Sequence, residues 1–124
     1  MKVVINKEIG VFHYTVDQMR YMKELADVMA HNDSYDDELA HMITTEAERI
    51  GKCEEFYDFY PTNYNDVYKY RSHRWVVEAC EAHPAKSQQI VDIEGEYYNI
   101  IENDDGTEYI ITPDINNFIK GFNN

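Results

Sequence analysis

The apolar residues near the N-terminus predict a short strand followed by an amphipathic helix. The β-branched run at 2–6 is typical of a strand. Over 16–31, apolar residues recur at spacings of three and four, which is the period of a helix with one buried face. Thr15 with Gln18 forms a capping-box pattern at the start of this segment. We therefore expect a capped helix to follow the first strand.

A second amphipathic pattern lies between Ser34 and Gly51. Ser34 or Asp36 is placed to cap it, and the acids in its first turn suit the positive end of a helix dipole. Gly51 is placed to end it. Because only a short turn separates this helix from the first, we expect the two helices to form an antiparallel hairpin.

The stretch at 55–75 reads EFYDFYPTNYNDVYKYRSHRW and is rich in aromatic residues. Pro61 and the polar residues after it break any continuous helix there. A new helix is predicted to start at a Ser72 cap, to bury Trp75 on its apolar face and to end before Pro84. The stretch therefore divides at Pro61 into an acidic half and a basic half.

After this helix the apolar pattern changes from helical to alternating. Strands are predicted at 88–93, 97–103 and 107–112, and the Asp-Asp-Gly sequence at 104–106 is a strong hairpin signal. Helices first and antiparallel strands afterwards favour the α+β class. We expect an N-terminal helical hairpin, a third helix, and a C-terminal antiparallel sheet that the N-terminal strand joins.

Length and composition are those of one globular domain. Of the 124 residues, 44% are apolar and 28% are charged, so a single domain over 1–124 is expected. No apolar run is long enough for a membrane span, and the N-terminus lacks the apolar region of a secretory signal. Cys53 and Cys80 do not make a disulfide framework, and a reducing cytoplasm is the predicted location.

The formal net charge is −13, and it is unevenly spread. Between Lys23 and Arg49 there are eight acids and no base, and the same holds between Lys86 and Lys120. Direct binding to a nucleic-acid backbone is disfavoured, because phosphates need cations opposite them. Attraction to basic partners is favoured instead.

Three stretches of the chain resemble a family of small phage-encoded proteins with no assigned activity. KVVINKEIGVF at 2–12 is similar to the family's opening strand and glycine turn, although Gly10 stands alone where the family has a double glycine. RSHRWVVEACE and IVDIEGEYYNIIENDDGTEYI are similar to its later helix and acidic hairpin. The resemblance leaves out 30–68. It implies a phage or prophage accessory protein in a bacterial cytoplasm, a class that often antagonises host defence.

The chain carries no catalytic or metal-binding signature. Glu38 and His41 form a Glu-x-x-His spacing, but a carboxylate-bridged metal site needs a second copy, which the sequence lacks. Cys80 with His83 has the residue types of a nucleophile pair, yet Cys80 lies on an apolar helix face, where thiols are usually inert. We therefore expect no enzymatic activity, no cofactor and no metal.

The acidic segments allow two interpretations. They can be a solvated face that keeps a small protein soluble, or a surface that imitates phosphates and occupies the basic groove of a nucleic-acid-binding protein. Eleven tyrosines strengthen the second interpretation, since tyrosine is enriched at interfaces. The leading hypothesis is an inhibitor of a basic host defence protein, of the anti-CRISPR or anti-restriction class. Its predicted partner-binding residues are Asp36, Asp37, Glu38, Glu54, Glu55, Asp58, Tyr57 and Tyr60.

The basic cluster supports an alternative hypothesis, a protein that sequesters a small nucleotide such as a defence second messenger. Cationic side chains at a helix start, flanked by aromatic rings, suit a phosphate and a stacked base. The residues of this alternative site are Tyr70, Arg71, His73 and Arg74. In so acidic a chain, pairing of the arginines with internal carboxylates is the favoured explanation. A structural phage component, or a homodimer with tyrosines between subunits, is the remaining alternative.

Overall fold

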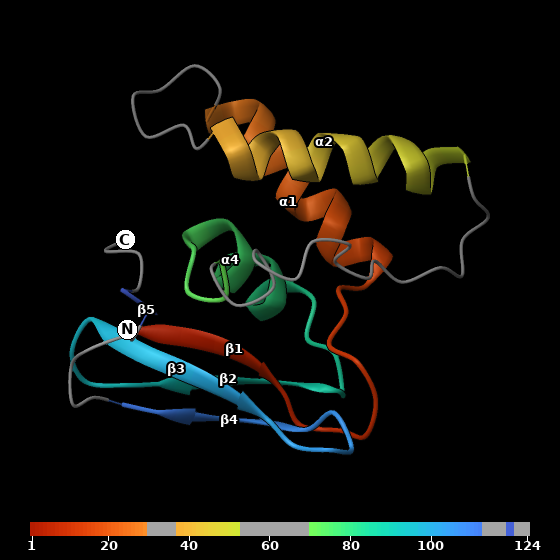
Figure 1. Ribbon diagram of the computed structural model, residues 1–124. Helices are drawn as coiled ribbons and strands as arrows, with labels where there is room; N and C mark the ends of the chain where they lie inside the picture. The colour runs from red at the N-terminus through yellow and green to blue at the C-terminus, as the bar shows by residue number, and fades with distance from the viewer. Residues whose placement is uncertain (30–36, 53–69, 113–118, 121–124) are drawn as a thin grey trace.

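The computed structural model describes residues 1–29, 37–52, 70–112 and 119–120 (Figure 1). Within these residues, helices come mostly before strands, as the sequence predicts. The elements are β1 (Lys2–Asn6), α1 (Val16–Met29), α2 (Asp37–Lys52), α4 (Arg74–Ala82), β2 (Gln88–Asp92), β3 (Tyr97–Glu102), β4 (Glu108–Ile111) and β5 (Ile119–Lys120). None of the described helices is long and apolar enough to cross a membrane.

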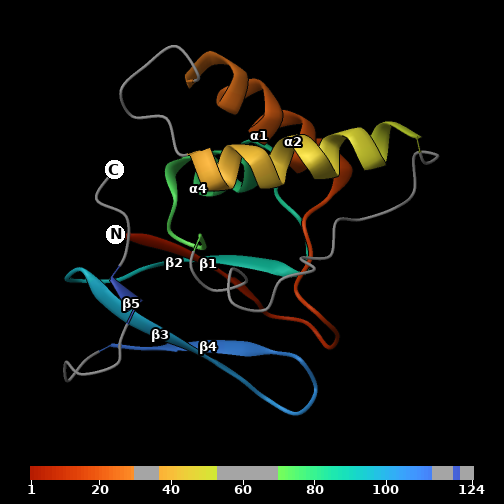
Figure 2. The same cartoon turned by 45° about the horizontal axis from the view of Figure 1, so that its top comes forward.

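The helices lie on one side of the molecule and the strands on the other (Figures 1 and 2). The helices α1 and α2 pack against each other, and the chain reverses direction between them. The helix α4 lies between this hairpin and the strands, and it contacts α1, β1 and β2. The predicted α+β class and helical hairpin are therefore confirmed.

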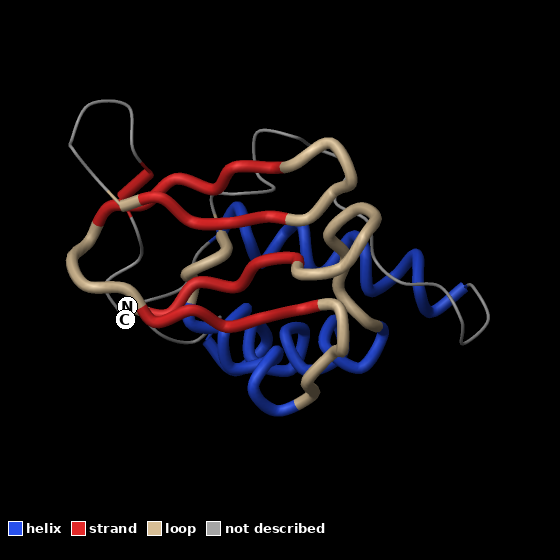
Figure 3. The backbone as a smooth tube through the Cα atoms, turned by 90° about the horizontal axis from the view of Figure 1, so that it is seen from below, coloured by secondary structure: helices blue, strands red, loops and turns tan. Residues whose placement is uncertain are grey.

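Hydrogen bonding divides the described strands into two antiparallel sheets, β1–β2 and β4–β3–β5. Seen from below, the strands form a layer with the helices behind it (Figure 3). The first strand does join the C-terminal strands, since Val4 pairs with Ile90 in the centre of the β1–β2 ladder. The sequence analysis expected one sheet. The structure differs because side chains, rather than a ladder, connect β1 to the neighbouring strand β4.

Alternation along β1 gives the molecule two apolar clusters. Val4 faces the helices and belongs to a cluster that includes Trp75 of α4. Val3 and Ile5 point to the opposite face of the strand, where they pack against residues of β3. The β1 strand is thus buried on both faces, which explains its continuous apolar sequence.

The start of α4 differs from the expected one. His73, not Ser72, is the N-cap, and its Nδ1 accepts a hydrogen bond of 3.2 Å from the Trp75 amide. The His73 amide itself bonds to the carbonyl of Tyr70, which closes a turn ahead of the helix. This turn directs the side chain of Ser72 to Tyr98, with which it is hydrogen-bonded. Tertiary contact therefore removed Ser72 from the cap position that the local sequence favoured.

Candidate functional site

One face of the β3–β4 hairpin presents large side chains to solvent. Tyr97 on β3 is 40% exposed, and Tyr109 and Ile111 on β4 are 46% and 39% exposed. Ile101 lies opposite Tyr109 in the ladder, and Asn99 lies opposite Ile111, so both belong to the same face. We call these five residues the outer face of the hairpin. A cluster of this kind is a candidate contact surface.

The hairpin and the segment before it are acidic. No base occurs between Lys86 and Lys120, and six of the eight acids in that interval are exposed in the structure. A seventh, Glu108, points into the protein. The exposed acids are Asp92, Glu94, Glu96, Glu102, Asp104 and Asp105. The hairpin therefore combines exposed aromatic side chains with a negative rim, formed by Glu96, Glu102, Asp104 and Asp105.

The hairpin turn is ordered by its own polar groups. The Asn103 amide bonds to the Thr107 carbonyl at 2.8 Å, and the Gly106 amide bonds to the Asn103 carbonyl at 2.9 Å. The Asp105 carboxylate accepts from both the amide and the hydroxyl of Thr107, at 2.9 and 2.6 Å. The hydroxyl bond is the largest cause of a lowered pKa at Asp105. A hairpin held in this way loses little conformational freedom when it binds.

The turn is also tied to the loop that follows β1. The side-chain amide of Asn6 donates to the carbonyls of Glu8, Gly10 and Gly106, at 2.7 to 2.8 Å. The Gly10 amide donates to the carbonyl of Asp105 at 2.8 Å. Gly106 lies so close to Gly10 that a Cβ atom at Gly106 would be 2.0 Å from the Gly10 oxygen. The β3–β4 turn is thereby fixed to the loop that follows β1.

An ion pair between Arg71 and Glu108 connects the inner face of the hairpin to β1. The two guanidinium nitrogens Nη1 and Nη2 lie 2.8 and 3.1 Å from the two carboxylate oxygens, and both side chains are buried. Nη1 also donates to the Val4 carbonyl, and the guanidinium carbon lies 3.4 Å from the centre of the Phe12 ring. The sequence allowed Arg71 either to bind a nucleotide or to pair with an internal carboxylate. The structure shows the internal pair.

The other residues of the alternative anion site have internal contacts as well. Tyr70 is buried, and its hydroxyl donates to Glu38 Oε2 at 2.6 Å. His73 is buried and caps α4. Arg74 is half-buried, and its Nη2 lies 3.0 Å from Sδ of Met29. The buried residues of this set do not open onto a surface that a nucleotide could reach.

The predicted partner-binding residues are only partly covered by the structure. Glu38 is exposed on α2, where it accepts the Tyr70 hydroxyl, and Asp37 is the first residue of that helix. The remaining predicted residues lie outside the described residues: Asp36, Glu54, Glu55, Tyr57, Asp58 and Tyr60. Partner binding by these six residues therefore stays a prediction.

The candidate chemistry of the thiol and the histidine is not supported by its surroundings. Burial raises the pKa of Cys80 from its usual value of 9.0 to about 12, so the thiol is protonated and inert near neutral pH. His41 is exposed on α2, and no group of three metal-binding side chains occurs among the described residues.

Sequence reasoning did not single out Tyr109 and Ile111. The signal was present, because residues that alternate along two strands of a predicted hairpin share one face. Tyr98, one of the eleven tyrosines, lies on the inner face and is fully buried. Comparison of the chain with family models, with curated proteins and with solved structures found no significant match.

Proposed function

We propose that the protein is a non-catalytic, phage-type accessory protein that binds and inhibits a basic, nucleic-acid-handling host protein. The observation that carries this proposal is the outer face of the hairpin, where Tyr97, Tyr109 and Ile111 are exposed on a hairpin that carries or adjoins four exposed acids. Tyrosine rings give contact area and a hydrogen-bonding hydroxyl, and they are enriched at protein interfaces. The inhibitor is of the anti-CRISPR or anti-restriction class.

Electrostatics selects the kind of partner. A net charge of −13 attracts basic proteins over long range and speeds their association. It repels nucleic acid and also repels a second copy of this chain. A basic groove that normally holds phosphates offers the complementary charge, and carboxylates on the rim of the hairpin take the place of those phosphates.

The proposal is tested by removing the aromatic rings while keeping the fold. The tagged protein is used to retain proteins from a bacterial lysate fraction enriched on heparin, and each retained protein is assayed for nucleic-acid binding. We expect the wild type to lower that binding and the double variant Tyr97→Ser, Tyr109→Ser to lose the effect. The matched control is Val28→Ser, which removes an exposed apolar residue from α1.

Salt and charge provide the second part of the test. Glu96→Lys should weaken retention, whereas Glu24→Lys makes the same charge change on the exposed side of α1 and should weaken it less. Retention should fall as salt rises, because exposed charges are screened. Full inhibition by the double tyrosine variant, or equal effects of the two lysine variants, contradicts the proposal.

A further inference from the structure

The hydrogen bonds of β1 show which edge of β2 has no neighbouring strand among the described residues. The Val4 amide donates to the Arg71 carbonyl at 2.9 Å, and the Val4 carbonyl accepts from Arg71 Nη1 at 3.1 Å. Both main-chain groups of Val4 therefore point away from β2. In an antiparallel ladder, residues that face each other share this property. Ile90, which faces Val4, must point its amide and carbonyl away from β1.

The same argument holds for the residues on either side of Ile90. The Asn6 amide points away from β2, toward Glu108 Oε1 at 2.7 Å, and Asn6 faces Gln88. By alternation Asp92 shares the orientation of Gln88 and Ile90. The Gln88 amide is taken by the Ala85 carbonyl at 3.0 Å. In the described part of the chain, the main-chain groups of Ile90 and Asp92 on this edge form no hydrogen bond.

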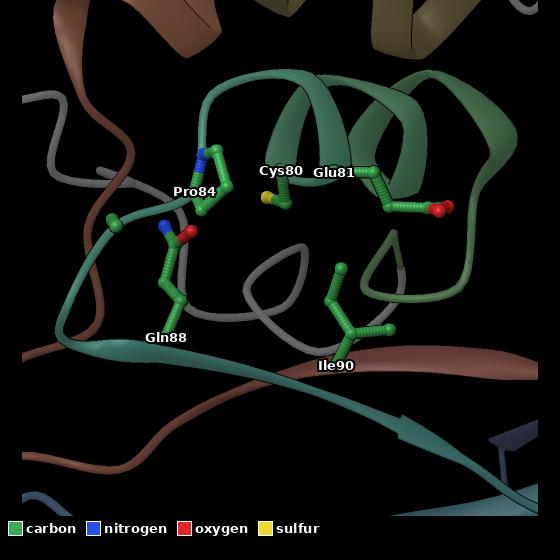
Figure 4. A pocket seen from close by; sticks show the side chains of 6 residues that line it. Cys80, Glu81, Pro84, Gln88 and Ile90 are labelled. Atoms are coloured by element: carbon green, nitrogen blue, oxygen red, sulfur yellow. The ribbon is translucent and has the colours of Figure 1, made fainter.

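A hollow lies beside this open edge. It has a volume of about 210 Å³ and is formed by the end of α4, the turn that follows it and β2 (Figure 4). Its lining residues are Cys80, Glu81, Pro84, Ala85, Gln88 and Ile90. The Cys80 thiol is buried and acts as a small apolar group there.

The hollow is on the side of β2 where an added strand would place alternate side chains. Ile90 packs against the apolar cluster that contains Val4 and Trp75, so its side chain is on the face of β2 that the helices cover. A strand laid along β2 would direct every second side chain to that face, beside Ile90. Cavities of about 150 Å³ hold benzene, so the hollow has room for one branched or aromatic side chain.

We propose that the outer edge of β2 is a strand-addition site for an extended segment of another protein. The segment forms main-chain hydrogen bonds with Ile90 and Asp92 and places one apolar side chain in the hollow. In such sites the main chain supplies affinity and the pocket supplies selectivity. This site is separate from the outer face of the hairpin, and it does not depend on the function proposed for that face.

Charge indicates the chemistry of the segment. The edge ends in Asp92, whose side chain is 74% exposed although it pairs with the Met1 ammonium, and Glu94 follows it in the exposed loop. A segment with a basic residue beside Asp92 and Glu94 therefore fits. A second copy of this chain would bring its own charge of −13 to the same edge, which disfavours self-pairing.

The test uses short synthetic peptides that alternate apolar and polar residues, have lysine at both ends and carry leucine or serine at the centre. Amide hydrogen exchange of the full chain is followed by NMR. We expect the Ile90 and Asp92 amides to exchange rapidly in the free protein and to become protected with the leucine peptide. The serine peptide should give a clear loss of that protection.

Two variants with the same charge change separate the edge from general electrostatics. Ile90→Lys places a charge on the proposed edge and should abolish protection, since inward charges block strand pairing. Gln89→Lys has the opposite side-chain direction and should leave protection unchanged. Ala85→Leu, which fills the rim of the hollow without altering the edge, should remove the preference for leucine.

Three results overturn the proposal. The first is that no peptide protects these amides. The second is that Gln89→Lys and Ile90→Lys behave alike while both remain folded. The third is that the amides are already protected in the free protein and sedimentation shows a dimer, because a second copy then occupies the edge.

Discussion

Arg71 and Glu108 are 37 positions apart in the chain and form a buried, two-point ion pair at 2.8 and 3.1 Å. The pair lies along the edge of β1 that faces away from β2. There, Arg71 bonds to the carbonyl of Val4 and Glu108 accepts from the amide of Asn6. Two side chains thus satisfy main-chain groups that a neighbouring strand would otherwise have to meet.

Removing one member of this pair should destabilise the protein strongly. Arg71→Met leaves the Glu108 carboxylate buried without its cation, which costs about 3–5 kcal/mol in comparable cases. The free energy of unfolding is measured in urea, with the fluorescence of the single tryptophan, Trp75, as the signal.

The double variant Arg71→Met, Glu108→Leu gives the matched control. It should be less destabilised than the sum of the single variants, because no unpaired charge is left inside. If the single variants each lose less than about 1 kcal/mol, in the range of an exposed pair, then the buried pair is not formed in solution.

The contact between Gly106 and Gly10 gives a second prediction. Gly106→Ala should be more destabilising than Gly95→Ala, although both glycines have positive φ, at 92° and 83°. A Cβ at Gly106 would be 2.0 Å from the Gly10 oxygen, whereas nothing lies within 4 Å of one at Gly95. Gly95→Ala should therefore cost only the left-handed conformation, about 1–2 kcal/mol.

Urea unfolding of both glycine variants checks this prediction. Equal losses of stability would mean that the hairpin turn does not rest on the loop after β1. The Gly106 variant should also speed hydrogen exchange at the Gly10 amide, which bonds to the Asp105 carbonyl.

Features set by neighbouring residues were predicted correctly from the sequence. The capping box is present, with Thr15 and Gln18 exchanging hydrogen bonds of 3.0 and 3.2 Å. The Asp-Asp-Gly turn joins β3 and β4, as the alternating pattern on either side of it indicated. Such features depend on spacings of a few residues, and those spacings are visible in the sequence.

Features set by distant contacts were not predictable. Nothing near Arg71 in the sequence identifies Glu108 as its partner, although the acidic composition favoured some internal carboxylate. Tyr97 and Tyr98 are adjacent in an acid-rich segment, yet one is exposed and the other is fully buried. The face of the hairpin that turns inward is decided by its packing on Val3 and Ile5, which lie at the other end of the chain.

Gln18 and Gln88 form a reciprocal amide pair inside the protein. Nε2 of each donates to Oε1 of the other, at 2.7 and 3.0 Å, and each Nε2 also donates to a main-chain carbonyl. Gln88→Leu should lower the free energy of unfolding by about 1–3 kcal/mol, because it removes the bonds that Gln88 makes with the buried Gln18 amide and with the His13 carbonyl.

The neighbouring Gln89→Leu is the control for this prediction. Gln89 is exposed, and substitutions at such positions usually change stability by less than about 0.5 kcal/mol. Gln18→Leu should cost more than Gln88→Leu, since it also removes half of the capping box at Thr15. The reverse order of the two variants in urea unfolding would contradict this account.

One buried thiol and two buried tyrosine hydroxyls have raised pKa values, which should make the protein sensitive to alkali. Burial raises the pKa of Cys80 from 9.0 to about 12, and it raises the pKa values of Tyr14 and Tyr98 above their usual 10.0. Above pH 9 the unfolded chain therefore releases protons that the folded protein retains. Stability from these groups is complete below pH 9 and is lost as pH rises toward their folded pKa values, at about 1.4 kcal/mol per pH unit for each group.

The contribution of Cys80 can be isolated by Cys80→Ala. Far-ultraviolet circular dichroism during urea unfolding at several pH values should show a flat free energy of unfolding up to about pH 8. Above that, the wild type should fall with a steeper slope than Cys80→Ala, because the variant lacks the group that titrates first in the unfolded chain. Parallel slopes for the two proteins would mean that the thiol ionises equally in both states and is not buried in solution.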